Sequence, residues 1–280
     1  MAVKKKAGIV NQILNFLKRR YNSLKYKNVS LYELKLDGIE LKYSTTDRYS
    51  NNWFYPRYDN GKYHEPTATH LFINEIKPNY CVFDIGTNLG FFTCLAGKLA
   101  SNGTVQGFEI DENCLPIVEK NLKLNQLTNV VMNNFAVSDN NDSEKIPVSV
   151  KPNPRLKFSN NAAPNFKFKE VKAIQIDSYI AQKSVTPDFI KIDVEGAELK
   201  VLKGMSLVLK NPKLKLLVEV HVPNLKEFFN TNYKDIIELL IKNGFTIKEL
   251  SDHRKDQSGF RDINIESELA GNTMIFAYKL

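Results

Sequence analysis

A glycine-containing segment that follows an apolar run carries the clearest chemical pattern in the sequence. It reads DIGTNLG over residues 84–90 and leads into an apolar stretch that predicts a helix over 90–100. Gly86 and Gly90 allow the backbone to turn sharply and to approach a ligand closely. The carboxyl end of a parallel strand and the free N–H groups at the start of the next helix face the same crevice. The segment therefore predicts a cofactor-binding loop.

The spacing in this loop argues against a nicotinamide or flavin dinucleotide. Those cofactors favour the pattern G-x-G-x-x-G, and here Asn88 takes the place of the middle glycine. The next predicted strand ends near Glu109, about 20 residues after the loop, where a carboxylate accepts hydrogen bonds from both ribose hydroxyls of an adenosine. Ile110 is expected to pack on the adenine. Contacts to the adenine edge are expected from Asn134, Phe135 or Ala136, after the third predicted strand.

Several segments together resemble the FkbM-type S-adenosylmethionine-dependent methyltransferases, a family of class I methyltransferases. Residues 84–93 match its form D-x-G-x-N-x-G-x-x-(S/T), and residues 188–198 (DFIKIDVEGAE) with 201–204 (VLKG) resemble its fourth motif. Residues 217–221 (LVEVH) resemble its next strand, and Glu65-Pro66 resembles its upstream element. The likeness covers residues 64–280 and implies S-adenosyl-L-methionine as the cofactor. The cofactor contacts that it implies are Glu65, Asp84, Gly86, Thr87, Asn88, Gly90, Phe91, Thr93, Glu109, Ile110, Asn134, Phe135, Ala136 and Asp193.

The family is largely assigned to O-methylation of sugars, polyketides and related hydroxyl acceptors. The resemblance therefore implies methyl transfer to a hydroxyl of a sugar, glycan, glycolipid or related small molecule. The turn at 193–196 (DVEG) lacks the (N/D/S)-P-P-(F/Y/W) pattern that is typical of amino-methylating enzymes. Two alternatives remain open: an RNA methyltransferase, suggested by the basic pI, and a non-catalytic scaffold that binds an adenosine ligand.

A hydroxyl acceptor must lose its proton, which requires a general base or a metal ion. The expected catalytic residues are Asp193, Glu195, Glu198 and His221, which follow two neighbouring predicted strands. His221 is the preferred base because an unperturbed histidine has a pKa near neutrality. In a second interpretation His221 only caps a strand and Glu198 a helix. In a third interpretation, Mg²⁺ is held by Asp193, Glu195, Glu219 and His221. The spacing of these residues in the sequence is not a compact metal-binding pattern, so the identity of the metal ligands stays open.

The elements that must position these residues alternate between strand and helix patterns from residue 66 onward. This alternation predicts an α/β fold of the Rossmann-like class I methyltransferase type, with a mostly parallel sheet covered by helices on both faces. The last two predicted strands have no helix between them and are expected to be antiparallel neighbours. Helices are predicted at 68–76, 90–100, 112–125, 197–209 and 233–243, and strands at 80–85, 103–110, 130–132, 171–176, 189–193, 214–221, 245–250 and 273–279.

Residues 1–63 are expected to form an N-terminal extension to a methyltransferase domain at 64–280. Two alternating runs joined by Asp37-Gly38 predict a β-hairpin. The aromatic segment 51–66 predicts either a loop or lid, or aromatic packing between the hairpin and the body. Residues 1–32 contain eight Lys and Arg residues and no Asp or Glu, so they account for the whole net charge of +8. Their apolar residues recur at helical spacing, which predicts a basic amphipathic helix.

Composition excludes several classes of protein. The chain of 280 residues is 42% hydrophobic and 25% charged, the balance of a globular domain. It has no run that approaches the ~20 apolar residues of a membrane-spanning helix, and three cysteines suit a reducing compartment. These features favour a cytoplasmic protein.

Outside residues 1–32 the chain has no net charge, which disfavours a nucleic-acid partner. The helix at 1–28 favours peripheral contact with an anionic membrane, contact with an acidic partner, or packing on the body. The sequence does not predict the oligomeric state.

Overall fold

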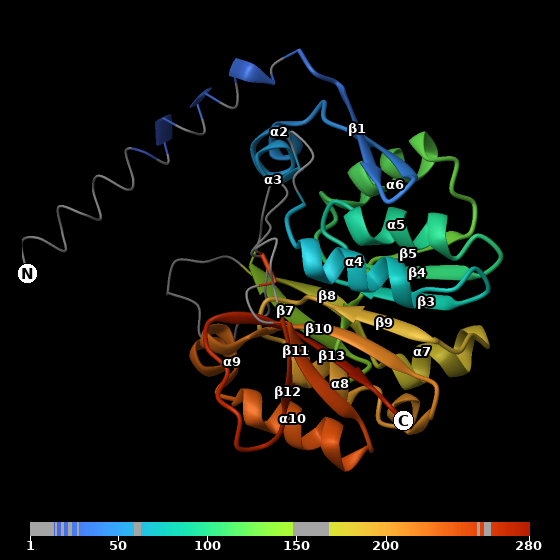
Figure 1. Ribbon diagram of the computed structural model, residues 1–280, viewed down its shortest axis with the longest axis vertical. Coiled ribbons are helices and arrows are strands. Elements are labelled where there is room, and N and C mark those ends of the chain that lie inside the picture. The colour runs from blue at the N-terminus through green and yellow to red at the C-terminus, as the bar shows by residue number, and fades with distance from the viewer. Residues whose placement is uncertain are drawn as a thin grey trace, which may run out of the picture. The chain divides into compact units, whose positions relative to one another are not determined.

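The structure is a computed structural model (Figure 1). It describes residues 28–58, 63–147, 168–250, 253–254 and 259–280, together with positions 14, 16, 17, 20, 21 and 24–26. The chain divides into two compact units, Met1–His64 and Glu65–Leu280. None of the helices in this described part of the chain is long and apolar enough to cross a bilayer.

The first unit contains the predicted hairpin. Strands β1 (Leu31–Leu36) and β2 (Ile39–Ser44) pair antiparallel. The turn residues Asp37 and Gly38 have φ values of 46° and 86°, the conformation that a tight two-residue hairpin requires. The hairpin is confirmed. Described positions between 14 and 25 are helical, and the rest of the predicted basic helix lies outside the described residues.

The prediction of a loop over residues 51–66 is wrong in its first half. Helices α2 (Arg48–Trp53) and α3 (Tyr55–Tyr58) occupy this part of the chain. Asp47 begins α2 by accepting a hydrogen bond from the backbone N–H of Ser50 at 2.8 Å, a typical N-cap. The ring of Phe54 stacks on Tyr58 at a centroid distance of 4.5 Å and lies 4.7 Å from Tyr43 of the hairpin. Aromatic packing on the hairpin therefore favours helix over loop here.

The second unit is built on an eight-stranded sheet with the strand order β12-β11-β13-β10-β9-β3-β4-β5. The strands are β3 (Cys81–Ile85), β4 (Thr104–Phe108), β5 (Val130–Asn133), β9 (Phe189–Ile192), β10 (Lys215–His221), β11 (Thr246–Leu250), β12 (Phe260–Ile263) and β13 (Asn272–Tyr278). The five strands from β10 to β5 run parallel, and β13 lies antiparallel between β10 and β11. The predicted parallel sheet with an antiparallel last strand is confirmed, with β12 as an addition.

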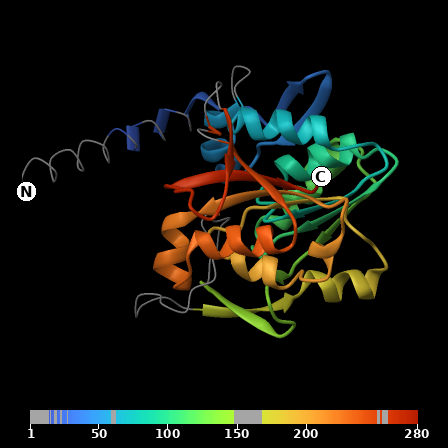
Figure 2. The same ribbon diagram turned by 60° about the horizontal axis from the view of Figure 1, so that its bottom comes forward.

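Helices cover both faces of this sheet, as Figures 1 and 2 show: α4, α5 and α6 lie on one face, and α7, α8 and α10 on the other. Their bounds, with those of α9 and a short 3₁₀ helix, are α4 (Pro66–Glu75), α5 (Phe91–Leu99), α6 (Leu115–Leu124), α7 (Ile176–Lys183), α8 (Glu198–Lys203), α9 (Val222–Phe229), α10 (Tyr233–Lys242) and Val208–Lys210. A small separate sheet has the order β6 (Ala136–Val137), β8 (Phe168–Ile174), β7 (Ser143–Pro147).

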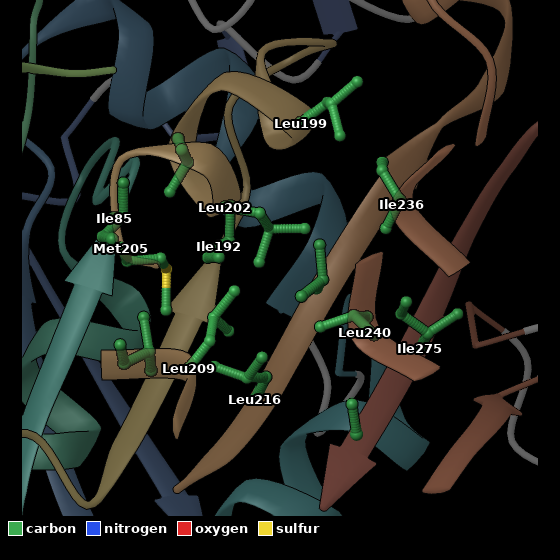
Figure 3. Close-up of a cluster of buried hydrophobic side chains, with 14 of the residues drawn as sticks. Ile85, Ile192, Leu199, Leu202, Met205, Leu209, Leu216, Ile236, Leu240 and Ile275 are labelled. Atoms are coloured by element: carbon green, nitrogen blue, oxygen red, sulfur yellow. The ribbon is translucent and has the colours of Figure 1, made fainter. Parts of the chain in front are cut away.

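The predicted helix 197–209 is shorter in the structure, because α8 ends at Lys203. A Cβ atom on Gly204 would lie 2.0 Å from the carbonyl oxygen of Ser138, so this position brings two backbones into close contact. The core between the sheet and α8 and α10 is a continuous hydrophobic cluster that includes Ile192, Leu202 and Leu240 (Figure 3). Burial of these side chains fixes the carboxyl ends of β9 and β10 in register.

Tyr179 of α7 joins this helix to the sheet through a buried hydroxyl. The hydroxyl donates to Oε1 of Gln106 at 2.6 Å and lies 3.1 Å from Oδ1 of Asn133. Its ring packs edge-on against Phe83 and Phe108 at 5.9 and 4.9 Å.

We expect Tyr179→Phe to lower the free energy of unfolding by ~1–3 kcal/mol, because a buried oxygen loses its donor while the ring packing stays. Urea unfolding followed by circular dichroism measures this change. Tyr80→Phe is the matched control, since Tyr80 is partly exposed beside Lys77, and should change stability by less than ~0.5 kcal/mol. An equal effect of the two substitutions would contradict a stabilising role for the Tyr179 hydroxyl.

Candidate active site

The predicted cofactor loop follows β3 at the carboxyl edge of the sheet. Gly86, Asn88 and Gly90 have φ values of 87°, 52° and 83°, a region that glycine and asparagine tolerate best. A Cβ atom on Gly86 would lie 1.8 Å from the carbonyl oxygen of Asp193. Only glycine therefore allows the loop to pass this closely over the end of β9.

Glu109, just after β4, lies against this loop. Its Oε2 accepts a hydrogen bond from the backbone N–H of Asn88 at 2.7 Å, and its Oε1 accepts one from Asp111 at 2.8 Å. The Asn134 amide donates to the Glu109 carbonyl at 2.7 Å. Burial raises the pKa of Glu109 to about 7, although the two backbone hydrogen bonds lower it. The loop and the expected ribose-binding and adenine-binding residues thus meet at one place.

Several of the expected cofactor residues are buried side chains that support this region. Thr93 donates from Oγ1 to Oδ2 of Asp84 at 2.5 Å, and Phe91 packs against Phe92 with ring centroids 5.0 Å apart. Ala136 is fully buried in a small apolar cluster. Ile110 and Phe135 remain partly exposed.

Thr87 offers an unused donor within the loop. Its Oγ1 is buried and has no hydrogen-bond partner among the described residues. The first N–H groups of α5, which begins after Gly90, also lack partners within that helix. Together with the Glu109 carboxylate, these groups form a donor and acceptor set that fits a nucleoside ligand with hydroxyl and carboxylate groups.

A buried lysine connects the loop with the neighbouring strand end. The Nζ atom of Lys191 in β9 lies 3.4 Å from Oδ2 of Asp193, 3.9 Å from Oδ1 of Asp84 and 4.7 Å from the ring centroid of Phe92. Burial alone lowers the pKa of an amine, but the Asp193 and Asp84 carboxylates outweigh it and raise the pKa of Lys191. Burial likewise raises the pKa of Asp193, but Lys191 and His221 outweigh it and lower that pKa.

His221, the last residue of β10, is the centre of the expected catalytic group. Its Nδ1 lies 2.7 Å from Oε1 of Glu198. Its Nε2 lies 3.7 Å from Glu219, 3.8 Å from Glu195 and 3.9 Å from Asp193, measured to one carboxylate oxygen of each. Burial lowers the pKa of His221, but the hydrogen bond to Glu198 and the other carboxylates raise it to about 10. The four expected catalytic residues therefore do lie together.

Glu195 and Glu198 differ in accessibility. The Glu198 side chain is fully buried, and its Oε1 also accepts a hydrogen bond from the backbone N–H of Gly196 at 2.8 Å. The Glu195 side chain is 26% exposed, and its backbone has a φ of 55°. Asn224 of α9 holds Glu195 by donating to both its carbonyl and its Oε2 at 3.1 Å. The Glu195 carboxylate is therefore partly accessible, whereas the Glu198 carboxylate contacts His221 from a buried position.

A second acidic cluster adjoins the first and contains residues that the sequence did not point to. Arg254 donates to Oε1 of Glu219 at 2.7 Å, and its Nε lies 4.0 Å from Glu65. The Nε2 atom of His253 lies 3.8 Å from Glu219 and 3.9 Å from Glu65. Burial, followed by the Asp193 charge, raises the pKa of Glu65 and of Glu219. His253 and Arg254 lie between β11 and β12, where no motif marks them.

The sequence matches the model of the FkbM methyltransferase domain over residues 84–247. The hexuronic acid methyltransferase AglP of Haloferax volcanii is 25% identical over 177 residues, which are 63% of this chain and 67% of that protein. A methyltransferase FkbM structure from Methylobacillus flagellatus shares 16% identity at a TM-score of 0.45, over 96% of this chain and 60% of that one. A precorrin-6y C5,15-methyltransferase structure from Geobacter metallireducens shares 12% identity at a TM-score of 0.45, over 76% of this chain and 87% of that one.

The matched family segment covers more than half of the chain and contains the cofactor loop, Glu109, the end of β9 and His221. The resemblance that the sequence suggested is thus confirmed. The chain belongs to the FkbM methyltransferase family and is an S-adenosylmethionine-dependent methyltransferase.

Proposed function

We propose that the chain transfers a methyl group from S-adenosylmethionine to a hydroxyl of a sugar, as a free sugar or within a glycan or glycolipid. The observation that carries this proposal is the group of Asp193, Glu195 and His221 beside the cofactor loop, because a neutral hydroxyl needs a proton acceptor at that point. The related protein from Haloferax volcanii is named for a hexuronic acid, which supports a sugar acceptor. The excess of carboxylates disfavours RNA, a polyanion.

The cofactor half of the site uses Glu109 and the loop at residues 86–90. Glu109 would accept hydrogen bonds from the ribose hydroxyls, and the Thr87 hydroxyl and the N–H groups at the start of α5 offer donors. When bound, S-adenosylmethionine supplies an activated methyl group on a sulfonium carbon. The chain itself therefore contributes mainly position and alignment, together with removal of the hydroxyl proton.

Glu195 is better suited than His221 to accept that proton. A pKa of about 10 leaves the His221 imidazole protonated at neutral pH, and its side chain is buried. Glu195 is partly exposed and is held by Asn224 at the mouth of the group. Asp193, next to the loop, would orient the acceptor hydroxyl, and Glu198 positions His221.

We expect the affinity for S-adenosylmethionine to fall as the pH drops below neutrality. The raised pKa of Glu109, about 7, means that the free protein loses its ionised ribose acceptor as the pH falls through that value. If only the ionised form binds, affinity should drop roughly tenfold between pH 8 and pH 6. Titration calorimetry across this range measures the effect.

Glu109→Gln should bind ~5–100-fold more weakly at pH 8, with a much flatter pH profile. Because the ligand ionises identically in both experiments, the difference between the pH profiles of the wild type and Glu109→Gln isolates the contribution of Glu109. Glu112→Gln is the control, since Glu112 is an exposed partner of Lys169, and should keep the wild-type profile. An unchanged affinity in Glu109→Gln would remove Glu109 from the cofactor site.

We expect Glu195→Gln to lower turnover by ~10²–10⁴-fold with little change in cofactor affinity, because the amide cannot accept the hydroxyl proton. Transfer of a tritiated methyl group to hexuronic acids, neutral sugars and RNA measures turnover. Glu227→Gln, an exposed position on α9, is the control. The expected product is a methyl ether. A methyl ester on a uronic acid, or methylated RNA, would contradict the hydroxyl acceptor.

We also propose that the basic N-terminal segment contacts an anionic membrane. The described residues Leu14, Leu17, Tyr21 and Leu24 are 54–68% exposed at a spacing that places them on one side of a helix. Residues 1–32 add eight basic and no acidic side chains, each worth ~1 kcal/mol near such a surface.

The full chain should therefore pellet with anionic vesicles more than with neutral ones, and added salt should reduce this binding. Sedimentation of the full chain, of a Leu17→Asp/Leu24→Asp variant and of a chain lacking residues 1–28 tests the prediction. The two altered proteins should remain in solution. Equal pelleting of all three would contradict membrane contact through this segment.

A further inference from the structure

The acceptor side of the site holds more negative than positive side chains. A group of five carboxyl groups faces Lys191, Arg254 and, when it is protonated, the His221 imidazole. The five are Glu65, Asp193, Glu195, Glu198 and Glu219. Buried charges are stable in proteins when they are paired or when they coordinate a metal ion. A metal ion that takes the place of the His221 proton would therefore add positive charge to this group.

The His221 imidazole is held as a metal-binding histidine is held. Glu198 fixes Nδ1 at 2.7 Å, and a carboxylate on that nitrogen sets the tautomer and orientation of a metal ligand. The His221 side chain is 1% exposed, and the hydrogen bond given for it in the described parts of the chain is made by Nδ1, not by Nε2. The Nε2 atom points instead at oxygens of Glu219 and Asp193, 3.7 and 3.9 Å away, distances too long for hydrogen bonds.

From this geometry we infer that Asp193, Glu219 and His221 bind a divalent transition-metal cation. One ligand atom from each lies within 4.8 Å of the other two, so a single ion between them can contact all three after small side-chain adjustments. Arg254 holds the Glu219 carboxylate at 2.7 Å, and Lys191 holds Asp193 at 3.4 Å. Both carboxylates are therefore positioned before a cation arrives.

A second trio shares Glu219 and consists of Glu65, Glu219 and His253, also within 4.8 Å of one another. All three of these side chains are buried, whereas the Asp193 side chain is 29% exposed. Only a cation at Asp193 keeps coordination positions open toward an acceptor. The geometry thus favours the trio at the ends of β9 and β10.

The ligand chemistry selects the type of cation. Mg²⁺ and Ca²⁺ prefer shells made of oxygen atoms, and an imidazole ligand shifts the preference toward first-row transition metals. Two carboxylates with one imidazole suit Mn²⁺, Fe²⁺ or Zn²⁺ better than the Mg²⁺ considered from the sequence. The role of the cation rests on the function proposed above. It would bind the acceptor oxygen and lower the pKa of that hydroxyl, whose O–H bond breaks as its proton passes to the Glu195 carboxylate.

Binding of Mn²⁺ to the full chain without acceptor tests the inference independently of activity. Electron paramagnetic resonance should show loss of the free Mn²⁺ signal at a stoichiometry of about one ion per chain. Pulsed spectra should show one coupled histidine nitrogen that disappears in His221→Gln. His221→Gln and Glu219→Gln should each weaken Mn²⁺ binding at least ~10-fold. Excess Mg²⁺ should compete poorly.

Glu249→Gln is the matched control, because Glu249 is also a buried sheet glutamate paired with an arginine, Arg261, at 2.6 Å. It should bind Mn²⁺ as the wild type does. Calorimetry with S-adenosylmethionine on every variant verifies that the cofactor half is intact. Methyl transfer without Mn²⁺ binding, or equal binding by His221→Gln, overturns the cation site and leaves the proposed function standing. Mn²⁺ binding without sugar methylation overturns the function and leaves the site.

Discussion

The site depends on one buried ionic interaction, that of Lys191 with Asp84 and Asp193. Asp84 belongs to the end of β3, from which the cofactor loop starts, and Asp193 follows β9, so the lysine connects the cofactor side to the acceptor side. Removing one partner from such a group leaves an uncompensated buried charge, which is far more costly than losing an exposed pair. The Lys191 ammonium also keeps Asp193 ionised at the point where the loop passes over the Asp193 backbone. The two halves are therefore fixed relative to each other by charge as well as by packing.

The positions of the glycine loop and of Glu109 in the fold could be predicted because they are short sequence patterns at strand ends. Gly86, Gly90 and Glu109 fall at places where a parallel sheet must expose its carboxyl edge, so type and spacing suffice to place them. Much of the fold could be predicted for the same reason, since buried parallel strands have continuous apolar sequences. The hairpin at Asp37-Gly38 is likewise a local pattern.

The remaining features depend on contacts between distant parts of the chain. His253 and Arg254 join the site only because β11 lies beside β13, which brings the segment after β11 to the same edge as Glu219. The end of α8 is determined by the approach of Gly204 to Ser138, which helical periodicity does not show. Helix α9 begins at Val222 directly after β10 and has a proline as its second residue, so its first residues continue the apolar strand pattern. The short strand β12 is mostly exposed and has no alternating pattern of burial.

The two units of the chain carry opposite electrostatic character, and this separates two kinds of anionic partner. Carboxylates dominate the acceptor side, so a polyanion would be repelled there, while a small sugar can enter if a proton acceptor or a cation receives its hydroxyl. The positive charge that sets the pI belongs to residues 1–32, which are part of the other unit. Net charge alone would suggest a nucleic-acid enzyme, but the positive charge lies in residues 1–32 and carboxylates gather at the ends of β9 and β10. The charge that would attract the protein to an anionic surface thus belongs to a different segment from the carboxylates at the ends of β9 and β10.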